Sequence, residues 1–359
     1  MDTSEFSNYT GNMINNKIIK LDCNENPLGP SKLAIEAIQH HLGSISRYPD
    51  NLTQSLKIKL SNRLAVNTNN LVIGNGSSSI LKLIIDLFLE NSSEIIIPNL
   101  TYDFVYNYAR SRLSHTISVP LNGWYIDLCL MLKYLTHKTR LIYLANPNNP
   151  TGTCFSHDEL EYFLSRIPSN TLVILDEAYH EYAQQKDFPQ SIALQKYFPN
   201  LIIVRTFSKI HGLAGLRIGY SISNENIAKK INNAIIKHSI NNIALIAADA
   251  AIEDVSHLKK SLETNLREKM RLTNLFRKLD LPFVPSDTNF IFFNTKHFAK
   301  DIQHYLKSQR VMVKTIENSA YHNYLRVSIG VDKENEAFAY AMEQLTTKNY
   351  LLLSAMDNC

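Results

Sequence analysis

The sequence predicts an α/β fold, with a mostly parallel seven-stranded sheet in a large domain and a smaller α+β domain. Three observations support it. Between residues 71 and 220, short apolar runs rich in Val and Ile alternate with helix-length amphipathic stretches. The runs are bounded by Gly, Pro, Asn or Asp, as is typical of buried parallel strands. The chain has 359 residues, which is enough for about two domains.

Seven apolar runs are expected to form the strands of the large sheet. They are residues 71–73, 94–98, 116–119, 141–145, 172–175, 201–204 and 218–221. Residues 78–90 and 156–167 are expected to be helices between them. The second of these begins with Ser156 three residues before Glu159, which is the spacing of a capping box.

The chain changes character after the alternating region. Residues 224–279 are expected to be long helices, residues 289–293, 311–313 and 325–329 strands, and residues 332–347 a closing helix. We therefore expect three segments. They are an N-terminal arm that joins the small domain (residues 1–50), a large domain (residues 51–255), and an interdomain helix followed by the C-terminal small domain (residues 256–359).

Composition argues against several classes of protein. The formal charge is only +4, without a dense Lys/Arg run, so no nucleic-acid partner is expected. Cys23, Cys129, Cys154 and Cys359 form no CxxC pair, and no metal site is expected. The N-terminus has no apolar signal core, and no apolar stretch reaches about 18 residues. We expect a cytoplasmic protein without a membrane span.

Lys209 follows the predicted strand at residues 201–204, at the position where α/β enzymes bind ligands. The turn before it contains Thr206 and Ser208, and a glycine-bearing loop after it leads to Arg217. The two hydroxyls and the guanidinium can donate to a phosphate. Taken alone, the segment is more typical of a surface loop than of a binding site.

Asp176 ends the predicted strand at residues 172–175. A buried carboxylate needs a cationic or proton-bearing partner, and a pyridinium N–H would be one. Tyr179 could turn its hydroxyl to the same place. Metal binding and helix N-capping are the alternatives for Asp176.

Further polar or aromatic residues follow other predicted strands. Asn149, in the Asn-Pro-Asn-Asn-Pro-Thr-Gly turn at residues 146–152, offers an amide to a ring oxygen. The Gly-Asn-Gly turn at residues 74–76 leads into Ser77, Ser78 and a helix start, which together form an anion site. Tyr102 adds an aromatic face.

Together these segments supply an amine, a phosphate cradle, a partner for a ring nitrogen and a donor for a ring oxygen. Pyridoxal 5'-phosphate is the cofactor that requires this set. The glycine turn is not GxGxxG, so a nicotinamide cofactor is disfavoured.

From about residue 19 to 346, the sequence resembles the fold-type I pyridoxal-phosphate aminotransferases. The motifs that carry this resemblance are residues 21–31 (Leu-Asp-Cys-Asn-Glu-Asn-Pro-Leu-Gly-Pro-Ser), 47–50 (Arg-Tyr-Pro-Asp), 74–77, 101–102, 146–152, 176–179, 206–209, 212–217 and 325–330. The Asn-Glu-Asn-Pro and Arg-Tyr-Pro segments resemble the histidinol-phosphate branch of that family.

The resemblance implies a role for each matched residue. Lys209 would carry the cofactor and move a proton, Asp176 would hold the ring nitrogen protonated, and Tyr179 would act with them. Cofactor contacts are implied for Asn149, Tyr179, Tyr102, Ser77, Ser78, Thr206, Ser208 and Arg217, and for Tyr48 from the partner subunit of a homodimer. Arg326 would bind the glutamate carboxylate, and Lys314 and Asn26 would also contact substrate.

The implied reaction is amino transfer between glutamate or 2-oxoglutarate and histidinol phosphate or imidazole-acetol phosphate, in histidine biosynthesis. Two departures from the family pattern bear on it. Residues 76–79 are Gly-Ser-Ser-Ser, so a helix-start carboxylate is missing. Lys314 stands near a position where the family usually carries arginine, and lysine cannot form a bidentate fork. An aromatic amino acid aminotransferase, a threonine-phosphate decarboxylase and a non-catalytic cofactor-binding protein remain alternatives.

Overall fold

The computed structural model describes residues 18–49, 51–112 and 115–356, with side chains described up to residue 345. The first 17 residues of the expected N-terminal arm, and Cys359, lie outside these ranges. The chain divides into two compact units. The larger unit comprises Glu25–Asn265 and Val284–Ile291, and the smaller unit comprises Leu266–Phe283 with the described residues up to Asn24 and from Phe292 onwards. The domain boundaries expected at residues 50 and 255 stay a prediction.

The larger unit is built on a seven-stranded sheet with the order β2-β8-β7-β6-β5-β3-β4. Its strands are β2 (Leu71–Gly74), β3 (Glu94–Pro98), β4 (His115–Val119), β5 (Thr139–Ala145), β6 (Leu172–Asp176), β7 (Leu201–Thr206) and β8 (Gly219–Ile222). Only β8 runs against its neighbours β2 and β7, whereas the pairs among β3 to β7 are parallel. The predicted mostly parallel sheet is confirmed, and each strand lies within two residues of its predicted position.

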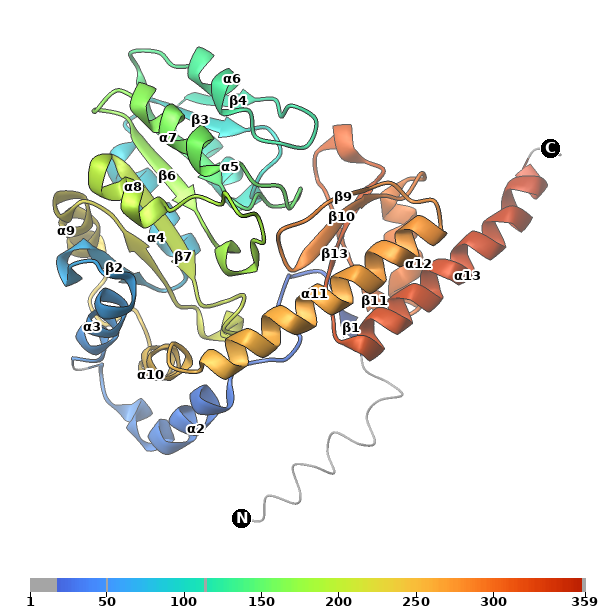
Figure 1. The fold of residues 1–359 in the computed structure, drawn as a ribbon, viewed down its shortest axis with the longest axis horizontal. Helices are drawn as coiled ribbons and strands as arrows, with labels where there is room; N and C mark the ends of the chain where they lie inside the picture. Colours follow the sequence, from blue (N-terminus) through green and yellow to red (C-terminus); the bar gives the residue numbers. More distant parts are fainter. Residues whose placement is uncertain (1–17, 50, 113–114, 357–359) are drawn as a thin grey trace. The chain divides into compact units, whose positions relative to one another are not determined.

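Helices cover both faces of this sheet (Figure 1). On one face, α4 (Ser77–Phe88), α5 (Asp103–Arg110) and α9 (Glu225–Ala234) contribute to a core around Ile95, Ile174 and Ile202. On the other face the core around Ile142, Leu175 and Ile203 is covered by α2 (Lys32–His41), α3 (Leu52–Leu64), α6 (Leu128–Lys133), α7 (His157–Arg166), α8 (Ser191–Tyr197) and α10 (Asn242–Ala251). Successive strand residues thus point to opposite cores.

The sequence signals at the ends of elements agree with the structure. Ser156 caps α7, with both hydrogen bonds of the predicted capping box to Glu159 present. In the described part of the chain, five short 3-10 helices connect other elements: η1 (Leu42–Ser46), η2 (Thr68–Asn70), η3 (His180–Tyr182), η4 (Ala214–Leu216) and η5 (Ser319–Tyr321). Among the described helices, none combines the length and the apolar character that crossing a membrane requires.

The C-terminal region contains a four-stranded sheet with the order β12-β13-β10-β9. Its strands are β9 (Phe283–Val284), β10 (Phe290–Asn294), β12 (Lys314–Thr315) and β13 (Tyr324–Ser328), and its helices are α11 (Val255–Lys278), α12 (Ala299–Ser308) and α13 (Asp332–Met356). β1 (Ile19–Lys20) pairs in parallel with β11 (Val311–Met312), so the N-terminal and C-terminal segments meet in the smaller unit.

Candidate active site

Several predicted cofactor residues of the larger unit lie at one edge of its sheet. Asp176 is the last residue of β6 and Thr206 the last residue of β7. Tyr102 follows β3, and Asn149 follows β5. Because these strands are parallel, their carboxyl ends meet at the same edge, which is where open α/β sheets bind ligands.

Asp176 is a buried carboxylate with two hydrogen bonds, and it is only 5% exposed. Its Oδ2 accepts from the Tyr143 hydroxyl at 2.9 Å, and its Oδ1 accepts from the Ala178 N–H at 3.1 Å. Burial raises the pKa of Asp176 to about 6, although both hydrogen bonds oppose the rise. The N-cap alternative is wrong, because the next helix, η3, begins at His180 with Tyr179 before it.

Lys209 lies partly buried in the loop after β7. Its Nζ lies 5.5 Å from the centre of the Tyr179 ring, and its charge lowers the pKa of Asp176. Tyr179 is itself buried and packs edge-to-face against Phe290, with ring centres 5.2 Å apart. The structure thus brings the predicted amine, carboxylate and phenol together.

The loop that carries Lys209 is held from both sides. Before it, Thr206 Oγ1 donates to Ser208 Oγ at 3.0 Å and accepts from the Ser208 N–H at 3.1 Å. After it, the Ile210 carbonyl accepts from the Asn26 amide at 2.7 Å, and the same amide donates to Ser261 Oγ at 2.9 Å. Asn26 therefore supports the residue next to Lys209, and its predicted contact with substrate stays a prediction.

Arg217 lies against the glycine turn before α4. Gly76 has φ +83°, and a Cβ on it would lie 2.8 Å from Arg217 Nη2. A Cβ on Gly219 would lie 2.6 Å from the Ser77 nitrogen. Only glycines allow the guanidinium, β8 and the start of α4 to approach this closely.

Tyr102 joins this region to Asp176. Its hydroxyl oxygen lies 3.2 Å from Ser78 Oγ, in the first turn of α4. Burial raises the pKa of the Tyr102 phenol, the Ser78 hydroxyl opposes the rise, and the Asp176 carboxylate adds to it. The helix start, the two hydroxyls and the guanidinium of Arg217 together suit an anion.

Asn149 lies in a turn that its neighbour Asn148 holds in place. Asn148 Oδ1 accepts from Thr101 Oγ1 at 2.8 Å, and its amide donates to the Leu100 carbonyl at 3.0 Å. Asn148 therefore ties the turn after β5 to the residues just before Tyr102, which positions Asn149 and Tyr102 on neighbouring loops.

The predicted substrate residues Lys314 and Arg326 lie in the smaller unit. They are directly opposite each other in the antiparallel pair of β12 and β13, so their side chains share one face. Arg326 is largely buried, and its Nη2 donates to the Asp22 carbonyl at 2.5 Å. Two cations side by side repel each other, and an anion bound between them would remove that cost.

Tyr48 is an exposed residue. Its side chain is 74% exposed, and its ring lies 4.7 Å from the ring of His238. Its predicted contribution to the site of a partner subunit stays a prediction.

Two buried features of this edge escaped the sequence reasoning. Tyr143, on β5, binds Asp176, and the signal that could have shown it is a hydroxyl within an otherwise aliphatic run. Arg205 donates to Glu177 Oε2 from Nε at 2.8 Å and from Nη2 at 2.7 Å. The sequence feature that could have shown this pair is the opposite charge of two neighbours of predicted site residues, Glu177 after Asp176 and Arg205 before Thr206.

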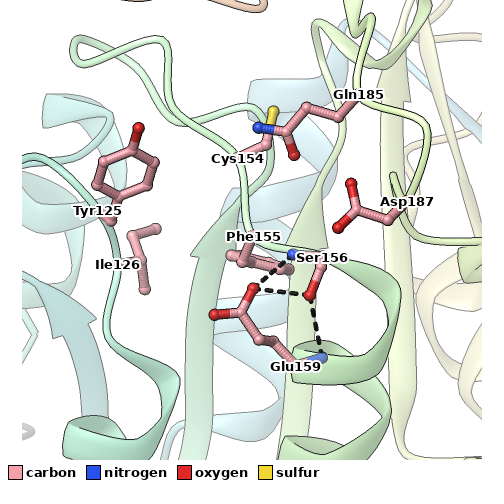
Figure 2. Close-up of a pocket in the computed structure, with 8 residues that line it drawn as sticks. All are labelled: Tyr125, Ile126, Cys154, Phe155, Ser156, Glu159, Gln185 and Asp187. Atoms are coloured by element: carbon pink, nitrogen blue, oxygen red, sulfur yellow. Dashed lines mark hydrogen bonds between the residues drawn. The ribbon is translucent and has the colours of Figure 1, made fainter.

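A separate pocket of about 340 Å³ lies beside the start of α7 (Figure 2). Glu159 and Asp187 contribute carboxylates to it, and Figure 2 shows Glu159 bound to Ser156. Since Glu159 is used to cap α7, and since no predicted site residue lines this pocket, we do not assign it to the site. Within the described residues, His, Cys, Asp and Glu side chains form no group that could hold a metal ion.

Comparison with known proteins decides the family. Residues 16–343 match the family model of the aminotransferases of class I and II. This chain belongs to that family. Histidinol-phosphate aminotransferase 1 of Nitrosococcus oceani is 39% identical over 325 residues, which cover 90% of this chain and 88% of the relative. The histidinol-phosphate aminotransferase of Moorella thermoacetica is 38% identical, with 91% of this chain and 85% of the relative covered.

A solved structure of the same family agrees in fold. The histidinol-phosphate aminotransferase of Sinorhizobium meliloti, in complex with pyridoxal-5'-phosphate, superposes with a TM-score of 0.88 at 28% identity, and covers 92% of each chain. The predicted family and fold of this aminotransferase are thereby confirmed.

Proposed function

We propose that this aminotransferase uses pyridoxal 5'-phosphate to transfer an amino group between glutamate and imidazole-acetol phosphate, which gives histidinol phosphate and 2-oxoglutarate. The observation that carries the proposal is the convergence of Lys209, Asp176 and Tyr179 at the sheet edge where Arg217 meets the start of α4. Relatives that bear the histidinol-phosphate name over about nine-tenths of this chain support the substrate.

The residues present fit that cofactor. Because Gly76 and Gly219 have no side chain, Arg217, Ser77 and Ser78 can lie close enough together to bind a phosphate. Asp176 is buried with a pKa raised to about 6, so it is mostly a carboxylate at neutral pH, and a ring nitrogen that carries a proton would satisfy it. When bound, pyridoxal phosphate supplies a ring that withdraws electrons from the substrate carbon next to the amino group.

Each side chain then has a definite task. The Lys209 amine would hold the cofactor and, when free, would act as the base that moves a proton from the substrate carbon to the cofactor. Asp176 would accept a hydrogen bond from the protonated ring nitrogen, Tyr179 and Asn149 would donate to the ring oxygen, and Tyr102 would cover a ring face. The phosphate would be bound by Ser77, Ser78, Thr206, Ser208 and Arg217.

Substrate recognition belongs to Arg326 and Lys314. We assign the glutamate carboxylate to Arg326, whose planar fork matches a carboxylate. Lys314, on the same face of the smaller sheet, is assigned to the phosphate of histidinol phosphate as a point charge. Asn26 is kept as a third substrate contact. A homodimer in which Tyr48 reaches the partner's cofactor phosphate, and a cytoplasmic location, complete the proposal.

The cofactor assignment is tested by Lys209→Ala, with the exposed Lys229→Ala as a matched control. The unchanged protein and Lys229→Ala should show the visible absorbance band of a lysine-bound cofactor, and Lys209→Ala should lack it. A band that survives in Lys209→Ala would contradict the assignment of Lys209.

The substrate assignment is tested by single-turnover reactions with histidinol phosphate, phenylalanine and threonine phosphate. We expect kcat/KM to be highest for histidinol phosphate, without release of carbon dioxide from threonine phosphate. Lys314→Met should reduce kcat/KM for histidinol phosphate by roughly 10- to 100-fold, because a charged hydrogen bond is lost. The same substitution should leave kcat/KM for phenylalanine nearly unchanged. A higher kcat/KM for phenylalanine in the unchanged protein would overturn the substrate, although not the cofactor.

A further inference from the structure

Tyr143 lies beneath the candidate site, in the middle of β5. Its register partner on β6 is Ile174, and the partner of Asp176 is Ala145. Residues 143 and 145 point to the same face of the sheet. Tyr143 therefore rises on the face that carries Asp176, among the aliphatic side chains of Ile97, Ile174 and Val204.

The phenol is enclosed, and its polar group meets Asp176. Tyr143 is 0% exposed, and its hydroxyl donates to Asp176 Oδ2 at 2.9 Å. Burial and the neighbouring carboxylate raise the pKa of this phenol well above its ordinary value. The hydroxyl therefore keeps its proton at every physiological pH, and in this contact it donates and Asp176 accepts.

The other groups that face Asp176 come from several elements. Lys209, after β7, is a cation, and Glu177, the next residue in the chain, is an anion. The phenol of Tyr102, after β3, interacts with the same carboxylate, and the phenol of Tyr179 interacts with those of Tyr102 and Tyr143. In the described site, Lys209 is thus a cation near Asp176, and Tyr143 is a permanent hydrogen-bond donor to it.

We propose that Tyr143 is a positioning residue for amino transfer, whose hydroxyl keeps the Asp176 carboxylate ionised and fixed in orientation so that the proton of the pair stays on the cofactor's ring nitrogen. The inference rests on the proposed function. A hydrogen bond to the charged form of an acid favours that form, so Tyr143 opposes the effect of burial on Asp176. Without the hydroxyl, Asp176 becomes a stronger base and competes with the ring nitrogen for the proton.

The first test needs no cofactor. The full chain, labelled at its aspartate carboxyl carbons, is titrated by NMR without cofactor, and Asp176 is identified as the signal that Asp176→Asn lacks. Its midpoint should rise by about one to two pH units in Tyr143→Phe, which is the value of a hydrogen bond to a charged group.

The matched control is Tyr108→Phe. Tyr108 donates to Asp86 Oδ1 at 2.6 Å, so the control breaks another tyrosine–aspartate hydrogen bond in the same unit. It should raise the midpoint of Asp86 and leave that of Asp176 in place. An Asp176 midpoint that stays the same or falls in Tyr143→Phe would overturn the proposal.

A second replacement should shift the Asp176 midpoint in the opposite direction, and it serves as the test if Tyr143→Phe does not fold. Fluorotyrosine at position 143, introduced through a reassigned codon, has nearly the same shape and is a stronger donor. It should lower the Asp176 midpoint, and a midpoint that rises instead would contradict the inference.

The loaded enzyme provides the test of function. Tyr143→Phe should slow the single-turnover reaction with glutamate roughly tenfold, with KM changed less than about twofold. In an Asp176→Asn background the same substitution should have no further effect, because its target has been removed. If the unchanged protein binds no pyridoxal phosphate, the proposed function fails. If it binds the cofactor but the two substitutions act additively, only the role of Tyr143 fails.

Discussion

The buried pair Arg205–Glu177 offers the sharpest prediction of stability. Glu177 is 0% exposed and accepts two hydrogen bonds from the guanidinium, at 2.8 and 2.7 Å. Burial alone would lower the pKa of Arg205, but the Glu177 carboxylate raises it overall. A backbone hydrogen bond beside the pair also joins the ends of β6 and β7, because the Glu177 N–H donates to the Val204 carbonyl at 2.8 Å.

Arg205→Met should therefore destabilise the protein by about 3–5 kcal/mol, because it leaves a buried carboxylate without its cation. In contrast, Arg205→Met combined with Glu177→Leu should recover most of that loss, because apolar side chains replace both charges. The exposed pair Lys278–Glu343, at 2.7 Å, provides the control, and Lys278→Met should cost about 1 kcal/mol or less.

Urea unfolding followed by circular dichroism would measure these free energies. The reasoning is refuted if Arg205→Met costs no more than Lys278→Met. It is also refuted if the double variant is as unstable as Arg205→Met, since the loss would then come from packing rather than from an uncompensated charge.

Three further predictions concern pH, backbone and capping. The pKa of Asp176 is raised to about 6 in the folded protein, so ionisation of this carboxyl destabilises the fold progressively between about pH 4 and pH 6. In cofactor-free protein, the free energy of unfolding of Asp176→Asn relative to the unchanged protein should therefore be about 2–3 kcal/mol higher at pH 7 than at pH 4, measured by urea unfolding. Gly212→Ala should destabilise by about 2 kcal/mol or more in thermal unfolding, since φ is +67° and a Cβ would lie 2.2 Å from the Gly29 carbonyl oxygen; Gly215→Ala, with open space at its Cβ, should cost about 1 kcal/mol or less. Ser156→Ala should cost about 1 kcal/mol by removing the α7 cap, and an equal loss in the exposed Ser165→Ala would contradict that cause.

Much of the larger unit could be predicted from sequence, because the spacing of apolar residues along the chain indicates which segments are buried. The Val- and Ile-rich runs found all seven strands, and Ser156 with Glu159 found the start of α7. The placement of Asp176 at the end of β6 and of Lys209 after β7 could be predicted as well, because the alternation makes these strands parallel, whereas the roles of both residues stay predictions. The end of the closing helix differs from its prediction, because α13 extends to Met356 rather than residue 347.

What the sequence determined by itself is thus the fold class, the family and the chemical groups at the ends of the strands. Only the tertiary structure decided which groups bind one another. Tyr143 and Asp176 are 33 residues apart, and neither periodicity nor turn chemistry relates them. Their contact depends on the register between β5 and β6, and the pairing of Arg205 with Glu177 likewise joins two neighbouring strands. Register is set by the packing of the whole sheet, so local sequence cannot encode it alone.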